Sequence, residues 1–390
     1  MRITGNMALS SLYGQVSKNM ESYRRIQEQV STEKQLLRPS DNPGGMASLN
    51  NLNTTKSANE KYMQNMDEAD TYLKATDSAL SQINDILAEA RTVAELNATG
   101  SSNNDVNDIG AQEIQQLIDR SLNIANTRVR DRYIFSGYNT DKPAYSESGK
   151  ILEPMAAAGN LYTGKTFSSG EFTGKENKSY LVRIVTAGQT GGAEYKVSED
   201  GGKTWGSNRI LTFETAIFDD AHGKDEGVKL RFETGTFAVG DQFQIDVVSG
   251  KYQGDDGIIE FNGSKHAQIQ TNLSGQEVFE NNNYFDIMYR LKRALENHNQ
   301  NEIGESLEQL KTLQSDFKQE TAKAGVRLNQ IEVARSNMKA VTERVSNNIA
   351  DIENVDVYKV LSEMTMFESA LNSSVKALSK VLPNSLINLI

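Results

Sequence analysis

The chain has 390 residues, a formal net charge of −11 and no cysteine. This length predicts two or three domains, and the acidic balance argues against binding of nucleic acid through the phosphate backbone. The lack of cysteine excludes disulfides and thiolate metal sites, and the absence of an apolar run of 18 or more residues predicts no membrane insertion.

The first 43 residues are predicted to form a helix and a loop. Apolar residues recur every seven positions, with others between them, and so lie on one face of a helix. We expect this face to contact a partner, because chain ends fray unless they are held. Its members are Leu9, Leu12, Val16, Tyr23, Ile26, Val30 and Leu37. After it, Ser40 or Asp41 can cap a second helix with Pro43 in its first turn.

A long helix is predicted over residues 62–94. Its apolar residues fall alternately four and three apart, which gives one continuous stripe at 3.6 residues per turn. Such a stripe predicts a buried core face. Its members are Tyr62, Met66, Ala69, Leu73, Thr76, Leu80, Ile83, Leu87, Ala90 and Ala94.

The middle of the chain is predicted to be an all-β insertion. Twenty of the 29 glycines lie between residues 141 and 280, and the runs 179–186, 193–200, 227–234 and 241–248 alternate as strands do. Because the flanks on both sides read as helix, we expect 141–280 to fold independently. Joining residue 140 to residue 281 should then leave the helical part folded.

The stretch "SEDGGKTW" at 198–205 has the pattern of an Asp-box, a turn found in sialidases and many β-proteins. In that turn the acidic and hydroxyl side chains bond to the backbone, and the glycines permit a tight corner. A single copy without an arginine cluster to hold a carboxylate sugar predicts a structural turn, with the one tryptophan anchored in the β core. The turn residues are Asp200, Gly201, Gly202, Thr204 and Trp205.

The last helix carries a second seven-residue repeat. Its apolar members are Val357, Val360, Met364, Phe367, Leu371, Leu378 and Val381. We expect this seam to pair with the first helix and to leave an apolar flank for neighbours. Pro383 predicts a kink or an end in the last turn.

The usual patterns of catalytic and metal sites are missing. His222, His266 and His298 form no His-Glu-x-x-His pair, and no phosphate-binding glycine loop or Gly-x-Ser-x-Gly elbow is present. We therefore predict no enzyme activity, no cofactor and no metal. A glycosidase or glycan-binding activity in the β part remains a remote alternative.

Four stretches resemble sequences of the flagellin superfamily. Within that superfamily they are most similar to the hook-associated junction proteins. The first, "VSTEKQLLRPSDNPGG" at 30–45, contains Arg38, Pro39, Ser40, Asp41 and Pro43, with Glu33 where the family usually has glycine. The others are "DRYIFSGYNTDKPAY" (131–145), "GTFAVGDQFQIDV" (235–247) and the tail at 352–390. Together the resembling flanks cover about two-thirds of the chain.

The resemblance implies three parts. Residues 1–43 and 346–390 would pair as an antiparallel coiled coil in an inner tube, disordered in the free monomer. Residues 44–140 and 281–345 would form a helical rod domain, and 141–280 the outward β-domain.

The resemblance also implies a structural role in the bacterial flagellum. The subunits would form a junction ring between the hook, through hook-associated protein 1, and the flagellin filament. They would be exported by the flagellar type III system without a cleaved signal peptide, with an export chaperone on the C-terminal helix. Flagellin itself, or another filament subunit, is the nearest alternative.

Overall fold

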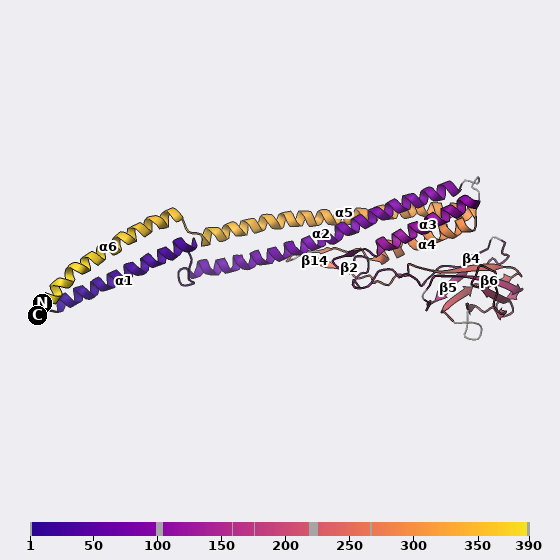
Figure 1. Cartoon of the computed structure of the whole chain (residues 1–390), viewed down its shortest axis with the longest axis horizontal. Helices are drawn as coiled ribbons and strands as arrows, with labels where there is room; N and C mark the ends of the chain where they lie inside the picture. The colour runs from indigo at the N-terminus through magenta and orange to yellow at the C-terminus, as the bar shows by residue number, and fades with distance from the viewer. Residues whose placement is uncertain are drawn as a thin grey trace. The chain divides into compact units, whose positions relative to one another are not determined.

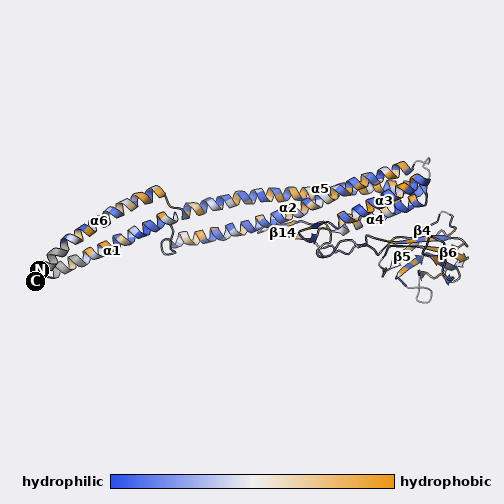
Figure 2. Cartoon of the chain, in the orientation of Figure 1, coloured by the Kyte–Doolittle hydropathy of each residue, from blue (hydrophilic) through white to orange (hydrophobic). Residues whose placement is uncertain are grey.

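The computed structural model describes residues 2–98, 104–157, 159–174, 176–217, 225–265 and 267–387. The chain divides into two compact units, Met1–Gln64 with Val333–Ile390, and Asn65–Glu332. Helices α2 (Pro43–Ala98) and α5 (Gln300–Glu353) contribute residues to both units. Hydrophilic and hydrophobic residues follow one another along both helices (Figure 2). The predicted class, a helical protein with an inserted β part, is confirmed.

The first unit contains the two ends of the chain. Helices α1 (Arg2–Thr32) and α6 (Val357–Ile387) lie side by side and run in opposite directions (Figure 1). A small separate core forms where α2 begins and α5 ends, around Leu49, Val345 and Ile349. Helix α6 continues through Pro383 to Ile387, so the helix does not end at this proline. The alternative, a kink at Pro383, stays a prediction.

The helices of the second unit are α3 (Asn104–Ala125), α4 (Tyr284–Glu296) and the adjoining lengths of α2 and α5. The stripe predicted over 62–94 is buried at every member from Met66 to Ala94. From Leu80 onward it packs in one cluster with apolar residues of α3, α4 and α5. The prediction that this stripe forms core is confirmed.

The β part has a hydrophobic core of its own. Its main antiparallel sheet has the order β3-β13-β6-β8-β9, with β4 also paired to β13, and a second sheet has the order β10-β11-β5. Side chains from both sheets pack together, among them Val182, Ile245 and Leu230. The four strands expected from alternation are present as β6, β8, β11 and β13.

The strands are short, and several are two-residue pairings. They are β1 (Arg128–Val129), β2 (Arg132–Tyr133), β3 (Lys150–Ile151), β4 (Met155–Ala156), β5 (Thr166–Gly170), β6 (Lys178–Thr186), β7 (Gly188–Gln189), β8 (Glu194–Ser198), β9 (Arg209–Ile210), β10 (Glu214–Ala216), β11 (Val228–Phe232), β12 (Thr236–Phe237), β13 (Gln242–Val248), β14 (Glu260–Ser264) and β15 (Ala267–Gln270).

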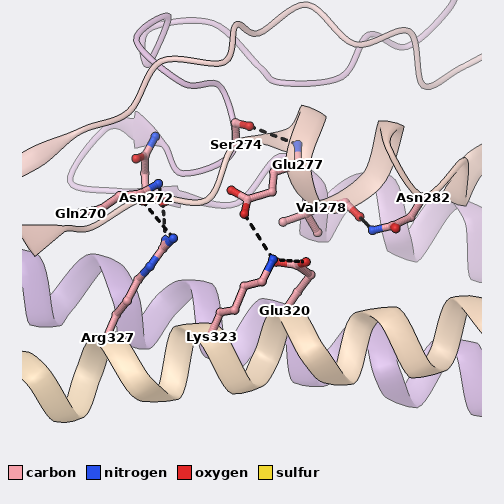
Figure 3. A network of polar contacts seen from close by, with 9 residues as sticks. All are labelled: Gln270, Asn272, Ser274, Glu277, Val278, Asn282, Glu320, Lys323 and Arg327. Atoms are coloured by element: carbon pink, nitrogen blue, oxygen red, sulfur yellow. Dashed lines mark hydrogen bonds and ion pairs between the residues drawn. The ribbon is translucent and has the colours of Figure 1, made fainter.

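The segment that returns from the β part is fastened to α5 by polar contacts (Figure 3). The Arg327 guanidinium donates to the Asn272 carbonyl at 2.9 Å and to Gln270 Oε1 at 3.0 Å. Lys323 Nζ lies 3.5 Å from Glu277 Oε1, at the start of a short π-helix, Gln276–Glu280. Residues 270–280 are therefore held on the helices and do not belong to the β core.

An aromatic cluster carries this attachment into the helical core. The Phe279 ring centre lies 5.6 Å from that of Tyr145, 5.6 Å from that of Phe317 and 5.4 Å from that of Phe135. Both Tyr145 and Phe279 belong to the core cluster of the helices. The predicted boundaries at 141 and 280 thus leave residues of the helical core inside the predicted insertion.

This packing predicts that two deletions behave differently. Leu152 N donates to the Asp246 carbonyl at 2.9 Å, next to the pairing of Ile151 with Val247. Replacing residues 153–245 by Asn-Gly should therefore close a two-residue hairpin and keep cooperative thermal melting of the helices. Joining 140 to 281 removes Tyr145 and Phe279, and loss of each buried ring costs about 3–5 kcal/mol of stability. This deletion should therefore abolish cooperative melting of the helices. Equal circular-dichroism melting curves for the two deletions would contradict the assignment of these rings.

A half-buried acid near this cluster, Glu280, predicts a pH dependence. Burial raises the pKa of Glu280, against the attraction of Lys150, whose Nζ lies 3.5 Å from Glu280 Oε2. The folded protein therefore holds more protons between the ordinary and the raised pKa, and its free energy of unfolding falls as pH rises through that window. We expect Glu280→Gln to reduce this slope in urea unfolding measured at increasing pH from the ordinary pKa of a glutamate upward. The exposed Glu260→Gln should keep it, and an unchanged slope in Glu280→Gln would refute the assignment.

Candidate assembly surfaces

The paired faces of α1 and α6 carry the apolar residues predicted at the chain ends. Ile26 and Val360 are buried, and the Asn19 amide donates to Ser374 Oγ at 2.9 Å across the pair. The half-buried members are Leu12, Val16, Tyr23, Val30, Met364, Phe367, Leu371 and Leu378. Val357 is 45% exposed, and the Leu9 side chain lies outside the described part of the chain. Few members of this seam are buried, and most of the stability of a helix comes from packing. Disorder of these ends before assembly therefore stays a prediction.

A second set of large apolar side chains on the same two helices is exposed. Met20 is 55% and Met366 is 58% exposed, although each lies on a helix that has a partner. The remaining members are Met7, Tyr13, Tyr358, Leu361 and Val375. The heptad spacing of Tyr13 with Met20 is a pattern in the sequence that indicates part of this set. Patches of exposed apolar side chains are typical of surfaces that contact another protein, so this set is a candidate assembly surface.

Asp41 closes the loop between α1 and α2, and Asn42 caps the start of α2. The Arg38 amide donates to Asp41 Oδ2 at 3.0 Å, and Arg25 of α1 lies 3.3 Å from Asp41 Oδ1. The Gly45 amide donates to Asn42 Oδ1 at 2.9 Å, so Asn42 is the N-cap of α2. The prediction of Ser40 or Asp41 as the cap is wrong, because Pro43 is already the first helical residue.

This loop is bonded to the linker between α5 and α6. The Gln35 amide donates to the Glu353 carbonyl at 2.7 Å, and the Val355 amide donates to the Glu33 carbonyl at 3.0 Å. Lys34 Nζ lies 2.5 Å from Glu353 Oε1. The two linkers are thus joined to each other by backbone hydrogen bonds and an ion pair.

Glu33 has a backbone conformation that favours glycine. It follows the last residue of α1 with φ 54°, in the left-handed region. Glycine is common at this position after a helix because it has no Cβ to clash there. Glu33 is also the residue that departs from the glycine of the resembling pattern.

The 198–205 turn has the hydrogen bonds of a tight corner. The Thr204 amide and hydroxyl donate to Asp200 at 2.8 and 2.6 Å, and the Gly202 amide donates to Ser198 Oγ at 2.8 Å. Hydrogen bonds to its carboxylate, above all that from the Thr204 hydroxyl, hold the pKa of Asp200 well below its usual range. Gly201 and Gly202 have φ of 70° and 92°. These contacts are structural, as expected of a turn.

Trp205 does not lie in the β core, so the prediction that it anchors the turn there is wrong. The ring is half-buried, with Lys196 Nζ 4.7 Å and the Arg183 guanidinium carbon 6.0 Å from its centre. It lies near Leu181, on the face of the sheet opposite the β core. Trp205 is the last residue of the turn, outside the strands, where strand alternation does not tell which face a side chain takes.

Of the three histidines, His298 is the one that the structure describes. His298 Nε2 lies 3.8 Å from Asp108 Oδ1, at the turn between α4 and α5. His222 and His266 lie outside the described residues. Among the described residues, no group of three or more His, Cys, Asp or Glu could hold a metal ion. No described helix is long and apolar enough to cross a membrane.

The conformation of Glu33 predicts that glycine stabilises the terminal helices. Glu33→Gly removes a left-handed strain of about 1 kcal/mol, so amide exchange in α1 and α6 should slow roughly fivefold in the full chain. The matched control Glu21→Gly places glycine inside α1, at an exposed position, and should speed exchange. Faster exchange in Glu33→Gly would show that the conformation at residue 33 carries no strain.

The two ends of the chain match known helical regions. The bacterial flagellin N-terminal helical region matches residues 3–140, and the bacterial flagellin C-terminal helical region matches residues 307–390. Together these matches cover more than half of the 390 residues.

Two relatives carry the same name. Flagellar hook-associated protein 3 of Escherichia coli (strain K12) is 29% identical over 154 residues, 39% of this chain and 49% of the relative. The protein of that name from Salmonella typhimurium is 26% identical over 149 residues, 38% of this chain and 47% of the relative. The chain thus spans about half the length of the curated relatives that it matches.

A solved structure has the same fold. It is that of a putative flagellar hook-associated protein from Vibrio parahaemolyticus, with a TM-score of 0.51 at 14% identity, over 80% of this chain and 100% of that chain. Since both helical regions of flagellin are matched in order at the two ends of the sequence, this chain belongs to the bacterial flagellin family.

Proposed function

We propose that this chain is a structural subunit of the junction between the hook and the filament of the bacterial flagellum, without catalysis. The observation that carries the proposal is the antiparallel pair of α1 and α6, which leaves large apolar side chains exposed on both helices. Both helices belong to regions matched by flagellin. The name shared by the two relatives supports the junction over the filament itself.

Assembly would supply the cover that a single chain lacks. Full burial of an exposed leucine, valine or methionine gains roughly 1.5–3 kcal/mol, and Met20 and Leu361, which are 55% and 45% exposed, would gain about half of that. Met20 lies on α1 and Leu361 on α6. The exposed residues of α1 in one subunit can therefore contact the exposed residues of α6 in the next subunit. Side-by-side contacts between unlike surfaces build rings or helical arrays. We infer that copies of this chain assemble in this way.

The partners follow from the place of such a ring. Hook-associated protein 1 would lie on the hook side and flagellin on the filament side, outside the cell. Before assembly, an export chaperone would cover α6 during flagellar type III export, since Tyr358, Leu361 and Val375 are exposed on it. Residues 1–43 with 346–390 would form the inner tube, and residues 44–140 with 281–345 the rod around it.

The exposed set on α6 permits a test that separates assembly from folding. Leu361→Asp should leave the thermal melting of the free chain unchanged, because Leu361 is 45% exposed there. In the ring an unpaired carboxylate among apolar neighbours costs several kcal/mol per subunit. Cells whose only copy carries Leu361→Asp should therefore release flagellin into the medium and have hooks without filaments in electron micrographs.

Two further variants make this test specific. Asn372→Asp places the same carboxylate at an exposed polar position of α6 and should keep filaments on hooks. Leu371→Asp changes the half-buried side of α6 and should also prevent filament attachment. Normal filaments in the Leu361→Asp cells would sink the proposal. Long filaments made of this chain itself would favour the alternative of a filament subunit.

A further inference from the structure

One face of the main β sheet carries polar residues and points away from the β core. Strand β6 directs Tyr180 and Val182 into the β core, so Ser179, Leu181 and Arg183 lie on the opposite face. Register places Gln244 beside Leu181 and Gln242 beside Arg183 on β13. On the other side of β6, Lys196 of β8 lies directly opposite Arg183.

A cavity of about 420 Å³ lies against this face. The strands contribute Ser179, Leu181, Gln242 and Gln244 to its lining. The turn between α4 and α5 contributes Asn297 and Asn299, and the first turn of α5 contributes one carboxylate, Glu302. No side-chain hydrogen bond is made by the amides of Gln242 and Asn297 within the part of the chain that the structure describes. Each amide offers two donor hydrogens and an acceptor oxygen. The wall is thus suited to a ligand rich in hydroxyl groups.

Two cations and the one tryptophan lie beside this cavity. Lys196 and Arg183 both face the Trp205 ring, and Gly201, in the turn before Trp205, lines the cavity. Like charges directly opposite on neighbouring strands repel each other. Neither cation has an ion-pair partner among the described residues; the carboxylate of Glu194, on the same face of β8, accepts from the Thr186 hydroxyl at 2.9 Å. An anionic group would relieve this repulsion.

We propose that this face binds an acidic oligosaccharide. The sugar carboxylate would pair with Lys196 and Arg183. Its hydroxyl groups would bond to the amides of Gln242 and Asn297 and donate to the carboxylate of Glu302. The Trp205 ring would give the pyranose an apolar surface at the rim, in the usual arrangement of a pocket with a few polar groups and an aromatic. A polynucleotide is disfavoured, because the net charge of the chain is −11.

The single tryptophan makes the test direct, since all tryptophan fluorescence of the full chain comes from Trp205. Trigalacturonate, trimannuronate and sialyllactose are titrated into the full-length protein, with calorimetry in parallel. Neutral galactotriose lacks the carboxylate, and the tripeptide Glu-Glu-Glu lacks the sugar. We expect a saturable fluorescence change with at least one acidic saccharide and at least tenfold weaker binding of both controls.

Variants locate the site. Lys196→Gln should weaken binding of the acidic saccharide about tenfold, as loss of one charged hydrogen bond does, and Gln242→Ala should also weaken it. Lys203→Gln changes an exposed lysine in the turn and should bind as the unaltered chain does. Circular-dichroism melting confirms that each variant is folded. No heat and no fluorescence change with any acidic saccharide at millimolar concentration would overturn the proposal, as would equal binding of either control or unchanged binding by Lys196→Gln.

Discussion

Helices α1 and α6 cannot bury all of their apolar side chains against each other, because two helices packed side by side cover only one face of each. The seam between them takes Ile26 and Val360, whereas Met20 and Met366 remain exposed on the same helices. The proposed function depends on these apolar side chains, which the pairing of the two helices leaves exposed. A chain that satisfied both faces within itself would have no reason to assemble, and its ends would be as stable as its centre.

The remaining structure holds these ends without supplying that cover. The two linkers are bonded to each other through Glu33, Gln35 and Val355, so the turns into α2 and into α6 are fixed together. In the second unit, Phe279 packs among the rings of α4, α5 and the chain that leads to the β part. This packing makes the returning segment part of the helical core.

The sequence predicted those features that repeat along the chain. The stripe from Met66 to Ala94 and the four strands are regular patterns, and packing keeps such patterns because each member makes the same kind of contact. Single positions were harder to predict. Asn42, Asp41 and Ser40 are all good capping residues, and the cap is decided by where the helix begins, which Pro43 indicated.

Other features that the sequence does not predict have no local sequence pattern that would indicate them. Tyr145 and Phe279 lie in glycine-rich or irregular stretches, and only the fold brings their rings together. Trp205 was expected in the core because large aromatic residues are usually buried, but the chain after the turn directs its ring towards Lys196. The exposed apolar set on α1 and α6 was partly within reach, since Tyr13 and Met20 share a heptad position. Its separation from the buried seam needed the actual pairing of the two helices.

Oxidation of methionine side chains tests the central claim most directly. Met20 and Met366 are 55% and 58% exposed, whereas Met66 is 1% exposed and serves as an internal reference. Hydrogen peroxide is applied to the free chain and to isolated hook–filament junctions, and sulfoxide is measured by mass spectrometry at each methionine. We expect Met20 and Met366 to be oxidised in the free chain and protected in the junction, with Met66 protected in both. Equal oxidation of Met20 and Met366 in the two samples would contradict the account.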